Sequence, residues 1–392
     1  MTETERMYAY FICSIPMIGG VRAGQLLSRF GDPQGVYEAG TAGWREILND
    51  SVVEYMDRQK KSGNLEEEYH SLGEKQIGLV LQEEEGFPQK LLEIPDPPYG
   101  LFYKGKLPEQ KQPSVAVIGA RECSEYGRFV AEELGRYLGS QGIQVISGMA
   151  RGIDGISQQA ALLAGGTSYG VLGCGVDICY PSQNRKLYEE LIQKGGLLST
   201  YAPGTKALPA YFPPRNRIVS GLADALIVIE ARQKSGTLIT VDMALEQGKN
   251  VYAVPGRITD RLSDGCNMLL RQGAGIALSP EDFLAEVSLL YGRNSFEWEG
   301  RREKSRGKRN EKKKDGRAEG EQTGEAADII DEGEKRVLSL LDVTPKSLDE
   351  LLAELKRQGQ ELGLSELTSK LILLCLKGEA VQIGGSYGIR QK

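Results

Sequence analysis

Seven short apolar runs recur between residues 113 and 280, and helical or loop-forming stretches separate each run from the next. Runs that are apolar at nearly every position are typical of strands buried on both faces of a parallel sheet. A repeated order of strand and helix joins such strands by crossovers. The sequence therefore predicts an α/β fold with a doubly wound parallel sheet. The predicted strands are VAVIGA from Val115, QVISG from Gln144, SYGVLGC from Ser168, LLST from Leu197, ALIVIEA from Ala225, NVYAVPG from Asn250 and GIALS from Gly275, with helices over Tyr126–Ser140, Gly155–Ala164 and Leu238–Gln247.

The segments that flank the sheet differ from it in composition, and a chain of 392 residues is too long for a single core. We expect a small helical domain over residues 1–86 and the sheet domain over 87–285. Residues 293–327 are charged and nearly free of aliphatic side chains, so we expect a disordered linker there. Residues 328–392 show leucines at helical spacing and a β-like end, which predicts a winged helix.

Two segments of the amino-terminal half, a turn and a stretch rich in Pro and Gly, suggest more specific local structures. The turn from Ile15 to Gly19 resembles a helix-hairpin-helix (SAM-like) motif, whose amides can meet a DNA phosphate, and a plain αα-hairpin fits the same pattern. The stretch from Phe87 to Lys106 is rich in Pro and Gly, so we expect an irregular connector that wraps onto the next domain.

The cysteines, the histidine and the hydropathy pattern exclude several classes of protein. Six cysteines form no C-x-x-C pair, and His70 is the single histidine, so neither a metal site nor a histidine-dependent catalytic triad is expected. The thiols are expected to be reduced. We find no signal-peptide layout and no apolar run of about 18 residues. No membrane insertion is therefore expected, and the predicted location is the cytoplasm.

The net charge of −6 conceals an uneven distribution. Residues 1–114 hold 12 basic and 18 acidic side chains, whereas residues 115–279 hold 16 basic and 14 acidic ones. Residues 301–317 hold 10 basic and 3 acidic side chains. Because the local field governs binding more than the total charge does, a polyanionic partner is compatible with this chain.

Small and basic residues follow the predicted strands, where ligands of such sheets bind. Neither a G-x-G-x-x-G nor a G-x-x-x-x-G-K-[ST] sequence is present, so no nucleotide cofactor is expected. Arginine guanidiniums and the amides at a helix start both suit phosphate oxygens. The sequence therefore predicts a phosphate-binding surface. Its candidate residues are Gly119, Arg121, Ser147, Gly148, Arg151, Arg215, Asn216, Arg217, Ser235, Gly236 and Thr237.

Four of these candidates also have a purely structural interpretation. Gly119 can serve helix–strand packing alone, and Arg151 can pair with Asp154 on the surface. Arg215 and Arg217, which we expect on a turn set by Pro213 and Pro214, can instead form salt bridges to Asp224 or Glu230.

Several of these segments together resemble one known family. The segments VAVIGARECSEYGR, SGMARGIDG, YPSQN, FPPRNRIVSGL, EARQKSGTLIT and AVPG occur in the order found in the DNA-processing protein A (DprA/Smf) family. The resemblance is dense over about residues 87–280. It implies an extended Rossmann-like fold that binds single-stranded DNA, usually as a homodimer, and helps to load the RecA recombinase during natural transformation.

The resemblance also implies roles for particular residues. Gly119 with Arg121, Ser147 with Gly148, Arg215-Asn216-Arg217 and Ser235-Gly236-Thr237 match the family's DNA-binding motifs, and Lys186 follows the YPSQN segment where a basic contact is expected. Three positions depart from the family pattern, because Ala120 replaces a serine, Gln158 a histidine and Thr200 part of a Ser-Glu pair. None of these departures removes a positive charge.

The sequence leaves two functions open. The first is a non-enzymatic protein that binds single-stranded DNA without strong sequence preference, with Tyr180, Tyr211 or Phe212 as candidate base-stacking residues. The alternative is a nucleotide hydrolase of the phosphoribohydrolase type, because SGTLIT also resembles the phosphate loop of those enzymes. In that case Glu230 would be the candidate catalytic carboxylate.

Overall fold

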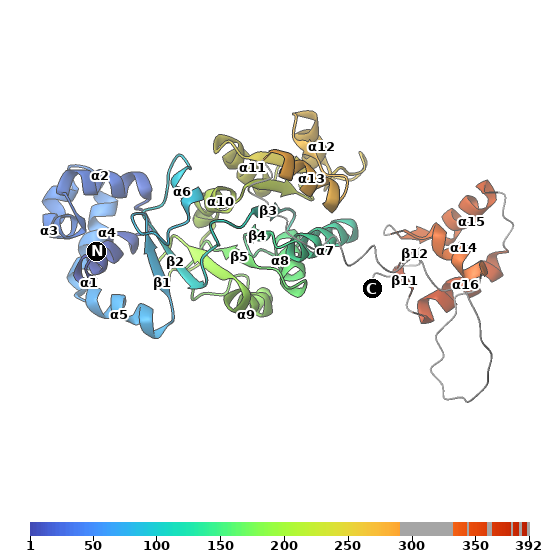
Figure 1. Cartoon of the computed structure of the whole chain (residues 1–392), viewed down its shortest axis with the longest axis horizontal. Coiled ribbons are helices and arrows are strands. Elements are labelled where there is room, and N and C mark those ends of the chain that lie inside the picture. The colour runs from blue at the N-terminus through green and yellow to red at the C-terminus, as the bar shows by residue number, and fades with distance from the viewer. Residues whose placement is uncertain (291–331, 343–344, 359–362, 378, 384–385, 390–392) are drawn as a thin grey trace, which may run out of the picture. The chain divides into compact units, whose positions relative to one another are not determined.

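The computed structural model describes residues 1–290, 332–342, 345–358, 363–377, 379–383 and 386–389. The chain divides into two compact units, Met1–Glu297 and Trp298–Lys392 (Figure 1). The segment 293–327, for which the sequence predicts a disordered linker, lies outside the described residues. Within the described part of the chain, no helix is both long and apolar enough to cross a membrane.

A nine-stranded sheet forms the centre of the first unit, with the strand order β1-β2-β6-β5-β4-β3-β7-β8-β9. The seven strands from β3 to β9 are parallel to their neighbours, which confirms the predicted doubly wound sheet. Strands β1 and β2 add an antiparallel edge beside β6. The strands are β1 (Gly78–Leu81), β2 (Gly100–Gly105), β3 (Ser114–Ile118), β4 (Gln144–Ser147), β5 (Ser168–Val171), β6 (Gly196–Ser199), β7 (Ala225–Val228), β8 (Asn250–Ala253) and β9 (Gly275–Ile276).

Helices cover both faces of the sheet, as strands that are buried on both faces require. Side chains alternate along each strand, so that Ala116 and Ile118 of β3 join one core and Val115 and Val117 join the other. Helices α6, α10, α11 and α12 pack on the first face, and α7, α8 and α13 pack on the second. Their bounds are α6 (Gln89–Leu92), α7 (Glu125–Ser140), α8 (Ile153–Leu163), α9 (Arg185–Lys194), α10 (Phe212–Gly221), α11 (Gly236–Glu246), α12 (Asp264–Arg271) and α13 (Pro280–Leu290).

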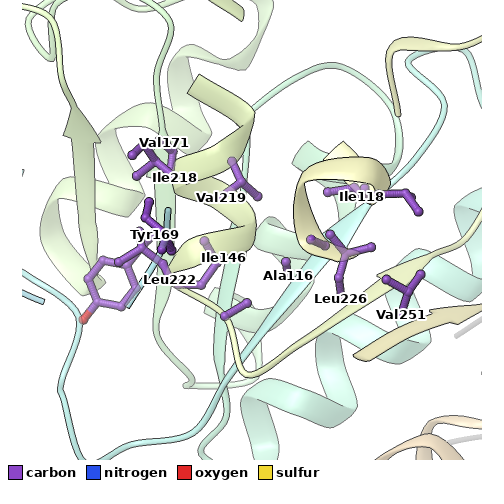
Figure 2. Close-up of a cluster of buried hydrophobic side chains, with 14 of the residues drawn as sticks. Ala116, Ile118, Ile146, Tyr169, Val171, Ile218, Val219, Leu222, Leu226 and Val251 are labelled. Carbon is purple, nitrogen blue, oxygen red and sulfur yellow. The ribbon is translucent and has the colours of Figure 1, made fainter. Parts of the chain in front are cut away.

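Helix α10 is docked rigidly on the first face of the sheet. Figure 2 shows Ile218 and Val219 of this helix, and Leu222 directly after its last residue, among apolar side chains from the strands, including Ile146 and Leu226. All five of these side chains are at most 2% exposed. The helix also contains the Arg215-Asn216-Arg217 segment, for which the sequence suggested a proline-bounded turn. Pro213 and Pro214 instead lie in the first turn of α10, where a missing N–H costs nothing.

The amino-terminal helices form a second core that continues onto the edge of the sheet. Phe11, Trp44 and Met56 are buried together with Leu81 of β1 and Phe102 of β2. Strand β2 lies inside the stretch that the sequence suggested was an irregular connector. The helices are α1 (Glu3–Cys13), α2 (Gly20–Phe30), α3 (Pro33–Trp44), α4 (Asp50–Ser62) and α5 (Leu65–Glu74).

The turn between α1 and α2 faces protein in this fold. The backbone N–H of Val21 donates to the Asp96 carboxylate at 3.1 Å. A Cβ on Gly20 would lie 1.8 Å from the carbonyl oxygen of Pro97, so only glycine fits there. The turn therefore serves as a contact to the sheet domain, and its role as a helix-hairpin-helix DNA contact stays a prediction.

Among its described residues, the second unit combines three helices with a small antiparallel sheet of order β10-β12-β11. Its core is made by the predicted leucine periodicity, with Leu351, Leu355, Leu367, Leu371 and Leu374 all at most 1% exposed. The winged-helix assignment stays a prediction. The elements are α14 (Glu332–Leu340), β10 (Lys346–Ser347), α15 (Leu348–Arg357), α16 (Leu364–Leu376), β11 (Ala380–Ile383) and β12 (Ser386–Ile389).

Helices α7 and α8 pack unusually closely because each presents small residues at a spacing of four. Gly135 and Gly139 of α7 lie against Ser157 and Ala161 of α8. A Cβ on Gly135 would lie 2.3 Å from the carbonyl oxygen of Ser157, and backbone of a packed helix has little freedom to move away.

We expect Gly135→Ala to destabilise the protein by about 1–3 kcal/mol, because the added methyl overpacks the α7/α8 contact. Gly24→Ala in α2 is the matched control, since its Cβ would meet open space and alanine favours a helix by up to about 1 kcal/mol over glycine. Urea unfolding followed by circular dichroism measures both. Equal stabilities for the two variants would contradict the packing described for α7 and α8.

Candidate nucleic-acid interface

The connections of the sheet diverge on either side of β3. From β3 the chain proceeds through β4 and β5 to β6 on one side, and then returns through α10 to β7 on the other side. Such a switch point leaves a crevice at the carboxyl ends of the strands, because the loops on its two sides lead to opposite faces of the sheet.

A cleft of about 620 Å³ lies at this point, and we call it the switch-point cleft. Its walls come from the loops after β3, β4 and β7, together with the first turns of α10 and α11. A volume of this size is typical of a site for a small ligand or for part of a larger one. The sequence-predicted residues in its lining are Gly119, Arg121, Gly148, Arg215, Asn216, Ser235, Gly236 and Thr237.

Arg215 forms the framework beneath the cleft. Its Nη1 donates to the carbonyl oxygen of Gly148 at 2.8 Å and to that of Val171 as well. The residue is 5% exposed and makes neither of the salt bridges that its structural interpretation suggested. Arg215 therefore ties the ends of β4 and β5 to α10. Its Nε is buried and has no hydrogen-bond partner within the described part of the chain, so the guanidinium keeps one donor.

Asp154, at the start of α8, is the acidic counterpart of Arg215. Its Oδ2 accepts the Gly148 N–H at 3.1 Å. This backbone amide, at a position that the sequence assigned to the phosphate-binding surface, is therefore engaged by a protein carboxylate. A Cβ on Gly148 would lie within 2.8 Å of both Asp154 and Arg215, which explains the glycine.

Burial acts on both members of this pair. It raises the pKa of the Asp154 carboxyl, and the neighbouring Arg215 guanidinium opposes that rise. Burial likewise lowers the pKa of Arg215 to about 10, partly offset by Asp154, so the guanidinium remains charged at neutral pH. Each charge thus depends on the other to remain inside the protein.

The exposed cations of the cleft surround an aromatic wall. The Arg121 guanidinium lies 5.7 Å from the centre of the Phe212 ring, and the Tyr180 ring lies 5.5 Å from Phe212. Tyr180 is 45% exposed, whereas the other candidate base-stacking residue, Tyr211, stacks on Tyr201. Arg232 adds a second exposed cation to the lining, which the sequence argument missed although it directly follows the predicted strand ALIVIEA.

The start of α11 closes the opposite wall. Ser235 caps the helix by accepting the Thr237 N–H, and the Thr237 hydroxyl donates to the carbonyl oxygen of Gly119 at 3.2 Å. A Cβ on Gly236 would meet nothing within 4 Å, so this helix start opens onto free space. The positive end of the α11 dipole therefore faces the cleft, where an anion is stabilised.

Four sequence-predicted residues do not line the switch-point cleft. Ser147 is fully buried, and its hydroxyl donates to the carbonyl oxygen of Val117 at 2.6 Å. Arg217 donates to the Asp96 backbone and lies 3.5 Å from its carboxylate, and burial lowers its pKa. Arg151 is exposed just beyond the cleft, and Lys186 lies in a separate groove. Their assignment to DNA contact stays a prediction.

The side chain of Glu230 is fully engaged in the fold. Its carboxylate accepts the N–H of Ser124 at 2.9 Å and the Ser124 hydroxyl, which fastens the start of α7 to the end of β7. The residue is 1% exposed, and a Cβ on Gly127 would lie 2.3 Å from it. Both the cap and the close packing give this carboxylate a structural role.

Gln158 also has its hydrogen-bonding groups used inside the fold. Its Oε1 accepts the Met149 N–H, and its Nε2 donates to Ser168 and to the carbonyl oxygen of Tyr169. The departure from the family's histidine is thus compensated by buried hydrogen bonds. Among the described residues, no group of three or more His, Cys, Asp and Glu side chains is placed to hold a metal ion.

The fold and the cleft together define a Rossmann-like protein whose switch-point cleft presents arginines, an aromatic wall and an open helix start. These features suit a phosphorylated, base-bearing ligand. The chain belongs to the DNA recombination-mediator protein A family, whose sequence profile matches residues 78–288.

Particular relatives are similar over the same region. The DNA processing protein DprA of Streptococcus pneumoniae is 44% identical over 200 residues, which are 51% of this chain and 71% of that protein. The protein Smf of Synechocystis is 30% identical over 296 residues, or 74% of each chain. The solved structure of the Streptococcus pneumoniae protein matches with a TM-score of 0.62 at 34% identity, covering 71% of this chain and 97% of that one.

The framework role of Arg215 predicts a stability effect. We expect Arg215→Ala to lower the free energy of unfolding by about 3–5 kcal/mol, because it leaves the buried Asp154 without its counter-charge. Arg121→Ala, the matched control, removes an exposed guanidinium and should leave stability within about 0.5 kcal/mol of the wild type. Urea unfolding at neutral pH measures both.

The loss in Arg215→Ala should also depend on pH. Without Arg215 the pKa of Asp154 in the folded state rises further above its unfolded value, so the folded protein binds a proton more tightly than the unfolded chain does. The deficit relative to wild type should therefore shrink as the pH falls from about 7 to about 5. A deficit that is constant over this range would argue against a charged Asp154–Arg215 pair.

Proposed function

We propose that the chain binds single-stranded DNA in the switch-point cleft and acts as a non-enzymatic mediator of DNA recombination. One observation supports this most strongly. The exposed Arg121 guanidinium, the Tyr180/Phe212 aromatic wall and the open start of α11 converge on one cleft. Phosphates suit the cations and the helix start, and unpaired bases suit the aromatic faces.

The contacts favour backbone recognition without strong sequence preference. Arginines and helix amides read phosphates, which are the same for every nucleotide. Aromatic rings stack on any base, provided that it is not already paired within a duplex. The cleft therefore favours a single strand over a double helix.

Family membership extends the proposal to partners. We propose that the bound strand is passed to the RecA recombinase and that the protein works as a homodimer, as the resemblance implies. The domains predicted at 1–86 and 328–392 are the proposed sites of further protein contacts. A protein that passes DNA to a recombinase must have access to DNA, and so the proposed location is the cytoplasm.

The hydrolase alternative requires a carboxylate that can reach a substrate. Glu230, the residue that would have to supply it, is buried and bonded by Ser124 through both its carboxylate oxygens. No observation in the cleft favours this alternative over DNA binding.

We expect Arg121→Ala to weaken binding of single-stranded DNA about 10-fold or more at low salt, since a hydrogen bond to a charged group is worth about 1.5–3 kcal/mol. The slope of log affinity against log salt should fall by about 0.7 for one lost phosphate contact. Fluorescence anisotropy with a labelled oligothymidylate measures both quantities.

Arg45→Ala is the control for a general charge effect, because Arg45 is an exposed cation on the amino-terminal helices. Its affinity and salt slope should match the wild type. The site assignment would be wrong if Arg121→Ala and Arg45→Ala behaved alike.

A further inference from the structure

A second depression lies beside the switch-point cleft, and nothing described so far uses it. This side groove, of about 480 Å³, runs between α7, α8 and the segment that leads into α9. Its lining includes Arg128 and Arg136 of α7, Lys186 of α9 and one acidic residue, Glu132. Three of these four charged lining residues are basic, although the chain as a whole is acidic.

The side groove adjoins the cleft at the loop between β4 and α8. Ala150 lines the cleft and Gly152 lines the groove, with the exposed Arg151 between them in the chain. Gly152 adopts a φ of 72°, and a Cβ there would lie 2.2 Å from the Ala120 carbonyl oxygen. The rim of the groove therefore touches the loop that carries Arg121.

Asn184 holds the far wall of the groove to the same loop. Its Nδ2 donates to the carbonyl oxygens of Met149 and Ala150, both at 3.0 Å. The start of α9, including Lys186, is thereby fixed relative to the cleft. The loop between β4 and α8 thus forms a common border of the cleft and the side groove, and hydrogen bonds from Asn184 hold this loop in place.

The cations of the groove are available to an added ligand. Arg128 lies 3.7 Å from Glu125, Lys186 lies 3.8 Å from Glu190, and Arg136 pairs with Glu133. Each pair is formed by two residues of the same helix. The basic side chains are well exposed, with Arg128 at 49%, Lys186 at 84% and Arg136 at 52%. Exposed pairs of this kind contribute little, so a phosphate can replace the carboxylate at small cost.

The dimensions of the groove fit several nucleotides. Arg128 and Arg136 are eight residues apart on α7, which corresponds to about 12 Å along the helix axis. This span exceeds a single phosphate. Gln159 and the 71%-exposed Leu163 of α8 also line the groove. The Gln159 Nε2 donates to the Glu190 carboxylate at 2.7 Å, whereas Leu163 offers an apolar surface to sugars and bases.

We propose that the side groove is a second nucleic-acid subsite, which holds the backbone of the same strand that occupies the switch-point cleft. Arg151 links the two, and Arg128, Arg136 and Lys186 contact phosphates beyond it. The inference rests on the proposed function, because it requires a strand in the cleft. A strand that fills both regions is longer than one that fills the cleft alone.

The test compares oligothymidylates of about 6 and about 20 nucleotides, lengths within and beyond the span of one compact binding surface. In the full chain, the combined variant Arg128→Ala, Arg136→Ala and Lys186→Ala should bind the short strand like the wild type. It should bind the long strand about 10-fold or more weakly at low salt, with a salt slope lower by about 2 for three lost contacts.

A matched control carries the same loss of charge elsewhere. Arg29, Arg45 and Lys61 are also exposed and each pairs with one carboxylate on the amino-terminal helices. Their combined replacement by alanine should leave the affinity for both strands unchanged. Because every replaced side chain is exposed, circular dichroism should show that both triple variants fold like the wild type.

The possible failures can be told apart. Unchanged affinity and salt slope for the long strand would overturn the subsite and assign the groove to a protein partner. An equal loss of affinity for both lengths would also overturn the subsite. The substitutions would then have altered binding in the cleft itself, and not contacts to the additional nucleotides of the longer strand. A wild-type protein that binds neither strand would overturn the proposed function itself.

Discussion

The buried pair of Arg215 and Asp154 is the interaction on which the shape of the cleft depends. Arg215 donates to the carbonyl oxygens of Gly148 and Val171, while Asp154 accepts the N–H of Gly148. The ends of β4 and β5 and the starts of α8 and α10 are therefore tied to two charges. Because each charge is buried, removing one leaves the other unpaired, and the loops cannot rearrange cheaply.

This framework separates the residues that build the cleft from those that face its contents. Arg215, Glu230 and the Gly148 amide make hydrogen bonds inside the protein. The groups that remain open are Arg121, Arg232, the aromatic wall and the start of α11. Keeping these groups on rigid loops favours binding, since little freedom is lost when a strand is held. The side groove likewise presents exposed basic side chains from α7, a helix that is packed against the sheet.

Much of the fold could be predicted from the sequence, because strands buried on both faces are rich in apolar residues. This apolar composition can be recognised within a few consecutive residues, as in VAVIGA and ALIVIEA. Strands β1 and β2 escaped prediction because their pairing is antiparallel, at the sheet edge, and β2 follows a proline-rich stretch. The edge is made by contacts between distant segments, which no local pattern records.

The position of the cleft was predictable for the same reason, since parallel strands end together. The orientation of individual side chains was not. An arginine has the same sequence signature whether it meets a phosphate or a carbonyl oxygen, and the partners of Arg215 and Arg217 lie far away in the chain. Arg215 and Arg217 have different partners because α10 is a helix, in which residues two apart point in different directions.

The most direct test of the account is a comparison of one sequence in single-stranded and duplex form, titrated against the full chain over a range of salt concentrations. The account predicts clear preference for the single strand and an affinity that falls linearly on a log–log plot as salt rises. Equal or tighter binding of the duplex, or binding that is insensitive to salt, would contradict a cleft that reads phosphates and unpaired bases.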